Sequence, residues 1–162
     1  MILGIITFVH VALSLIGILS GFVVAYGLLS AKRLDGWTGV FLATTVLTSV
    51  TGFFFPFHKF LPSHAVGIVS LVVLVISLYA RYGRKMSGGW RRTYVITAMV
   101  ALYLNVFVLV AQLFMKVPAL QALAPTQSEP PFLVAQATVL LLFVVLSVLA
   151  TIQFGSERLR TT

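Results

Sequence analysis

FLVAQATVLLLFVVLSVLATIQF, residues 132–154, decides the class of fold, because it contains no Asp, Glu, Lys or Arg. A helix of about 20 such residues crosses a hydrocarbon core of roughly 30 Å. A backbone in lipid must satisfy its own hydrogen bonds, and the run lacks the alternation of a barrel strand, so it should be helical. Four further stretches share this apolar character: 2–29, 37–55, 64–82 and 93–115. The sequence therefore predicts an all-α polytopic membrane protein, with five transmembrane helices in a compact bundle and one transmembrane domain, 1–162.

Composition supports contact with the lipid bilayer. Of the 162 residues, 60% are hydrophobic and 9% are charged, whereas a soluble domain carries about 25% charged residues. The net charge of +8 does not indicate a nucleic-acid partner, because the cations lie between apolar runs and no aromatic–basic motif accompanies them. The chain has no cysteine, which excludes disulfides, thiolate metal sites and cysteine nucleophiles.

The distribution of Lys and Arg predicts the orientation of the chain in the membrane. Nine of the eleven occur in alternate connections or in the tail, and the other connections hold only Lys59 and Lys116. Cytoplasmic loops are enriched in Lys and Arg. We therefore expect an outside N-terminus and a cytoplasmic C-terminus, in a multi-pass protein of a bacterial inner membrane. The nine cations are Lys32, Arg33, Arg81, Arg84, Lys85, Arg91, Arg92, Arg158 and Arg160.

Small residues along the first helix predict a packing seam. Gly17 and Gly21 form a GxxxG pair, a spacing that allows two helix backbones to approach closely. The seam could pack against other helices of the chain, a larger membrane complex or a second copy in a homo-oligomer.

Polar residues within or beside the apolar runs gather in the predicted outer half. Polar groups in a membrane are costly unless they are paired, so each is a candidate functional residue. The set consists of His10, His58, His64, Asn105, Gln112 and Gln136.

Two neutral imidazoles from different helices, His10 and His64, could ligate the iron of haem b axially. Together with His58 they could instead contribute to a copper or zinc site. Asn105, Gln112 and Gln136 could support such a cofactor or bind a quinone carbonyl. Purely structural roles are equally open: His10 and the amides could bond a neighbouring helix, His58 could be a solvated loop residue, and Glu129 could pair with Lys116.

The sequence lacks the residues and motifs that most enzyme reactions require. The only acids are Asp35, Glu129 and Glu157, and topology separates Glu129 from the other two, so a pair of carboxylates for acid–base catalysis is not expected. The sequence contains no HExxH, no GxSxG elbow and no phosphate-binding glycine loop. The sequence favours a protein without catalytic activity.

Three segments of the two outer connections resemble small multi-spanning bacterial membrane proteins of unknown function, a likeness that implies no activity. We expect a non-catalytic subunit or scaffold of an inner-membrane complex. The alternatives are a small haem- or quinone-binding redox protein with its site near the outer face, and a small-molecule permease or channel. The three segments are 55–57 (FPF), 61–64 (LPSH) and 124–132 (APTQSEPPF).

Overall fold

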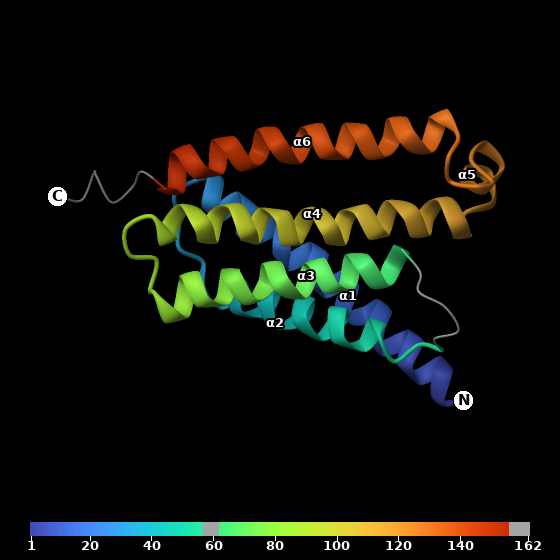
Figure 1. Ribbon diagram of the computed structural model, residues 1–162, viewed down its shortest axis with the longest axis horizontal. Coiled ribbons are helices and arrows are strands. Elements are labelled where there is room, and N and C mark those ends of the chain that lie inside the picture. Colours follow the sequence, from blue (N-terminus) through green and yellow to red (C-terminus); the bar gives the residue numbers. More distant parts are fainter. Residues whose placement is uncertain (57–61, 156–162) are drawn as a thin grey trace.

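The computed structural model describes residues 1–56 and 62–155, and every regular element in these ranges is helical (Figure 1). Each long helix runs opposite to the one before it, so the start of α1 and the end of α6 lie at opposite ends of the bundle. The long helices begin and end within three residues of the predicted stretches, apart from α3. They are α1 (Ile2–Leu29), α2 (Asp35–Gly52), α3 (Pro62–Leu78), α4 (Trp90–Lys116) and α6 (Pro130–Gly155).

Two elements were not predicted from the sequence. The last predicted turn of α3 is a π-helical segment, η1 (Tyr79–Gly83), in which Arg84 N–H bonds Tyr79 O at 2.8 Å. The connection after α4 contains a short helix, α5 (Pro118–Leu123), which has proline in its first turn. Proline is tolerated there because the first N–H groups of a helix have no intrahelical partner.

Four described helices are long and apolar enough to cross a membrane: α1, α3 together with η1, α4 and α6. Large hydrophobic side chains lie exposed along them, most densely on α1 and α6. Such a surface would be costly in water and fits contact with lipid. The helix α2 is not among the four, because Asp35 and several Thr and Gly residues lower its hydropathy.

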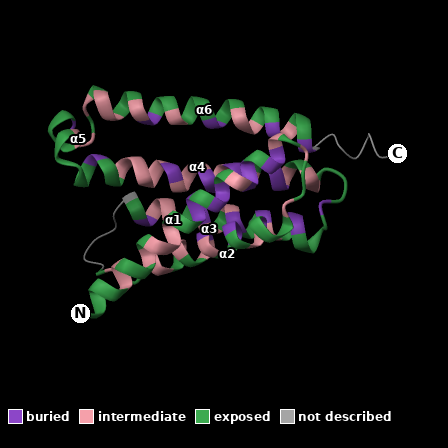
Figure 2. Cartoon of the chain, turned by 180° about the vertical axis from the view of Figure 1, so that it is seen from behind, coloured by how far each residue is buried: buried purple, intermediate pink, exposed green. Residues whose placement is uncertain are grey.

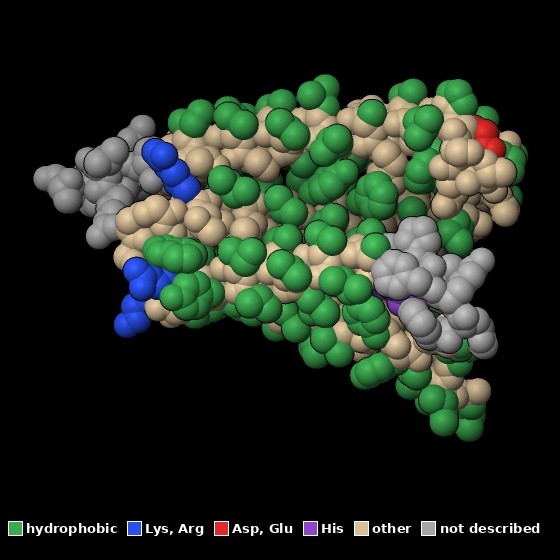
Figure 3. All heavy atoms as spheres, in the orientation of Figure 1, with side chains coloured by type: hydrophobic (Ala, Val, Ile, Leu, Met, Phe, Trp, Pro, Cys, Tyr) green, Lys and Arg blue, Asp and Glu red, His purple; other side chains and the backbone are tan. Residues whose placement is uncertain are grey.

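The two ends of the bundle differ in charge. Lys and Arg side chains gather where α3 ends and α4 begins, on the left of Figure 3, whereas the visible Glu and His side chains lie at the other end. We call these the basic end and the histidine end. The first half of α1 belongs to the histidine end, together with the last turns of α2 and α4 and the first turns of α3 and α6.

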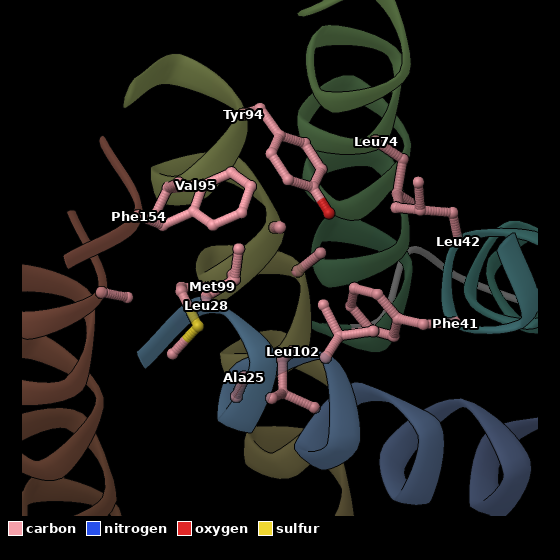
Figure 4. Packing of buried hydrophobic residues seen from close by; sticks show 14 of the residues in the cluster. Ala25, Leu28, Phe41, Leu42, Leu74, Tyr94, Val95, Met99, Leu102 and Phe154 are labelled. Carbon is pink, nitrogen blue, oxygen red and sulfur yellow. The ribbon is translucent and has the colours of Figure 1, made fainter. Parts of the chain in front are cut away.

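The closely packed core lies toward the basic end. Its largest fully buried side chains come from different helices and include Phe41, Leu74, Tyr94 and Phe154 (Figure 4). Buried residues are correspondingly frequent toward the C-terminal end of the bundle and rare at the N-terminus (Figure 2). The histidine end is therefore less tightly filled.

The glycine seam of α1 packs within the chain. A Cβ on Gly21 would lie 2.5 Å from Leu102 Cδ1 and 3.0 Å from the ring of Phe41, and one on Gly17 would lie 3.2 Å from Thr45 Oγ1. Both glycines thus let α1 approach α2 and α4. A homo-oligomer through the Gly17/Gly21 seam would have to displace these helices.

At the basic end, η1 buries a cation beside the core. The Arg81 side chain is 4% exposed and pairs with Asp35 at the start of α2. Its guanidinium carbon also lies 5.1 Å from the centre of the Tyr94 ring. Asp35 pairs in addition with Arg33 at 3.4 Å. The pair ties η1 to α2, with α4 in contact through Tyr94.

Candidate ligand cavity

A cavity of about 510 Å³ lies at the histidine end, between α1, α2, α3 and α4. Small-molecule sites typically have volumes of about 300–1,000 Å³ and mainly apolar walls. Four of the residues selected from the sequence line it: His10 on α1, His64 on α3, and Asn105 and Gln112 on α4. These residues are far apart in sequence, and helix packing brings them to one space.

His10 is held by a hydrogen bond to Thr51 on α2. Its Nδ1 lies 2.9 Å from the hydroxyl oxygen of Thr51, and that hydroxyl donates to Thr48 O at 3.1 Å. A hydroxyl has a single hydrogen, so when Thr51 donates it to Thr48 O, the bond with His10 requires the proton on Nδ1. In that tautomer the other ring nitrogen, Nε2, has a lone pair that can accept a hydrogen bond or ligate a metal. The ring is fixed by an edge-on contact with Phe55, at 5.3 Å between centroids.

His64 lies in the first turn of α3 and is 6% exposed. Its ring is 6.0 Å from that of Phe53, which follows the last residue of α2. A Cβ on Gly67 would lie 3.1 Å from the same Phe53 ring. The glycine therefore lets Phe53 lie against α3, beneath the histidine.

One stripe of α4 supplies further polar groups to the wall. Asn105 donates from Nδ2 to Thr45 Oγ1 at 3.2 Å, which links α4 to α2. Further along the stripe, Gln112 and Lys116 are exposed, and neither makes a hydrogen bond or ion pair with a residue in the described ranges. At about 1.5 Å per residue, the stripe from Asn105 to Lys116 is roughly 16 Å long. The cavity thus extends along α4, with free donors near the end of that helix.

A further polar group in the wall is unsatisfied. The Thr48 hydroxyl oxygen is buried and has no partner within residues 1–56 and 62–155. Unpaired buried polar groups cost about 1–3 kcal/mol, so a ligand or water that bonds this hydroxyl would be stabilised. Sequence analysis missed Thr48 as a site residue, although Thr44, Thr48 and Thr51 share one face of α2.

One of the selected residues, Gln136, does not line this cavity. Gln136 is 8% exposed on α6, and its Nε2 donates to Phe107 O at 3.1 Å, a contact between α6 and α4. His58 lies outside the described residues. Among the described residues no three His, Cys, Asp or Glu side chains group closely enough to hold a metal ion. The metal site of three histidines therefore stays a prediction, because the structure describes only His10 and His64 of the three.

Glu129 does not pair with Lys116, contrary to one of the structural roles considered for it. Its carboxylate accepts hydrogen bonds from the Thr126 hydroxyl at 2.7 Å and from the backbone N–H groups of Thr126 and Ser128. These bonds, that of the Thr126 side chain first, lower the pKa of Glu129 below its ordinary value. The carboxylate is thus ionised at neutral pH and is engaged in its own loop.

Comparison of the chain with protein-family models, with curated proteins and with solved structures finds no match.

Proposed function

We propose that the protein crosses a bacterial inner membrane five times, with the N-terminus outside and the C-terminus in the cytoplasm. The nine-to-two distribution of cations supports this orientation. The antiparallel course of the long helices supports an odd number of spans. In this arrangement α2 also crosses the membrane, in addition to the four helices named above. Its polar residues pack against α1 and α4 or line the cavity.

We propose further that the protein binds a small lipid-soluble molecule in the cavity at the histidine end, through the oxygen atoms of that molecule. The observation that carries this proposal is the convergence of His10, His64, Asn105 and Gln112 on one cavity. The cavity supplies hydrogen-bond donors, since the Gln112 amide and the Lys116 ammonium are not engaged by described residues. Phe53 and Phe55 add aromatic surface.

A quinone matches this chemistry, because it is lipid-soluble, flat and carries two carbonyl oxygens. Gln112 can donate to one carbonyl and Thr48 to the other, while the aromatic residues contact the ring. Haem b is the second candidate, supported by the presence of two histidines in one cavity, with His10 Nε2 offering a lone pair.

The subunit or scaffold interpretation stays a prediction, and the geometry supports it less. The GxxxG seam that favoured it is occupied by α2 and α4. A permease would need a polar passage to both ends, whereas the described residues toward the basic end pack into an apolar core. Neither the subunit interpretation nor the permease interpretation explains why the cavity is present.

Filling the cavity tests the proposal. Ser14 lines the cavity from α1, so Ser14→Trp should place an indole inside it. We expect this variant to bind a short-chain benzoquinone at least about tenfold more weakly, a loss of about 1.4 kcal/mol. Equilibrium binding by isothermal titration to the purified protein measures the effect, and the absorption spectrum of the same preparation shows a Soret band if haem b is bound.

Ala43→Trp is the matched control, because Ala43 is exposed on α2 and does not line the cavity. It should bind the benzoquinone as the unmodified protein does. Absence of both benzoquinone binding and a Soret band in the unmodified protein would contradict a quinone or haem b as the ligand. Equal binding by the two tryptophan variants would place the site elsewhere.

A further inference from the structure

We infer that the cavity selects an acid: a single-chain amphiphile whose carboxylate binds Lys116 and whose apolar chain lies between α1 and α4. This inference rests on the proposed function and names the class of ligand. It goes beyond a neutral quinone, because it assigns a charge to the part of the ligand at the outer end of the cavity.

The first step is that Lys116 pairs with no acid among residues 1–56 and 62–155. The sequence holds three acids, and residues 57–61, which follow the wall residue Pro56, contain none of them. Asp35 pairs with Arg33 and Arg81 at the basic end. Glu129 is held by Thr126 and Ser128. Glu157 follows α6, whose last residue lies at the basic end.

The second step is that the described lining is neutral or basic. Besides Lys116 it contains two histidines, two amides and several hydroxyls, but no Asp or Glu. An anion placed there meets no like charge. A charge-assisted hydrogen bond to an ammonium is roughly twice as strong as a neutral one, and Gln112, one turn away on the same stripe, can donate a second bond.

The third step concerns the rest of the ligand. Leu15 and Ile18 on α1 and Val108 and Leu109 on α4 line the cavity. These walls can bury an apolar chain at about 25 cal/mol per Å². A volume of about 510 Å³ belongs to the small-molecule range, which favours one chain over a two-chain phospholipid.

The test compares dodecanoate with its methyl ester, which has the same chain but no charge. Binding of isotope-labelled ligand is measured at pH 8 by equilibrium dialysis, with the protein in nanodiscs of zwitterionic lipid. We expect dodecanoate to bind at least about tenfold more tightly than the ester. Lys116→Met and Lys116→Gln should each abolish that preference, since both remove the charge from an exposed position. Lys85→Met, which removes a cation at the basic end, should preserve it.

The possible contrary results distinguish failure of the inference from failure of the proposed function. If the benzoquinone binds but dodecanoate is no better than its ester, the proposed function stands and the inference is overturned. If none of the three ligands binds, both fall. If phosphatidylglycerol added to the nanodiscs displaces dodecanoate in proportion to its mole fraction, the site binds a phospholipid headgroup. The inference of a single-chain acid is then overturned.

Discussion

Replacing Asp35 with asparagine should destabilise the folded protein by about 3 kcal/mol, because it leaves the buried Arg81 guanidinium without its counter-charge. The Arg81 side chain is 4% exposed, so water cannot replace the carboxylate. The Asp35 side chain is 62% exposed, which places the expected loss at the low end of the range for buried pairs. The free energy of unfolding, measured by detergent titration, checks this value.

Two variants isolate the cause. Arg33→Gln removes the other ion pair of Asp35, in which both side chains are more than half exposed, and should cost less than about 1 kcal/mol. The double variant Asp35→Asn with Arg81→Met removes the buried charge as well and should recover most of the lost stability. An Asp35→Asn variant as stable as Arg33→Gln would show that the buried cation has no need of this partner.

Gly21→Ile should destabilise the bundle by about 3 kcal/mol, the upper part of the usual range for overpacking a filled core. The first carbon of the new side chain would already lie 2.5 Å from Leu102 Cδ1 and 3.0 Å from the Phe41 ring. Phe41 and Leu102 are both almost fully buried, so neither can move aside without disturbing the core. Detergent titration of unfolding again provides the measurement.

Gly39→Ile is the matched control, since a Cβ on this α2 glycine meets nothing within 4 Å. It should change stability by less than about 1 kcal/mol, because only helix propensity is altered. Equal losses for the two isoleucine variants would mean that α1 does not approach α2 and α4 through Gly21.

The helices could be predicted because their signals are local. Apolar length between charged or proline-containing connections defines α1, α4 and α6 to within three residues. The π turn could not be predicted, because no local pattern marks it, and its Arg81 pairs with Asp35, which is far away in sequence. The helix α5 is so short that only its first-turn proline marks it.

Part of the candidate site could also be predicted from local sequence, and part of it could not. The amphipathic stripe of α4 places Asn105, Gln112 and Lys116 on one face from spacing alone. No local pattern shows that His10 and His64 meet the same cavity, since this depends on how α1 and α3 pack. Gln136 shows the converse: a polar residue at the same predicted depth bonds a backbone carbonyl of α4 instead.

The orientation of the bundle is tested most directly by cysteine accessibility in intact cells, since the chain has no cysteine of its own. Ala119→Cys places a thiol on α5, between α4 and α6, and Ser87→Cys places one between η1 and α4; both positions are exposed and neither change removes a charge. A membrane-impermeant maleimide should label Ala119→Cys in intact cells and Ser87→Cys only after permeabilisation. Labelling of Ser87→Cys in intact cells, with Ala119→Cys protected, would put the basic end outside and contradict an outer cavity.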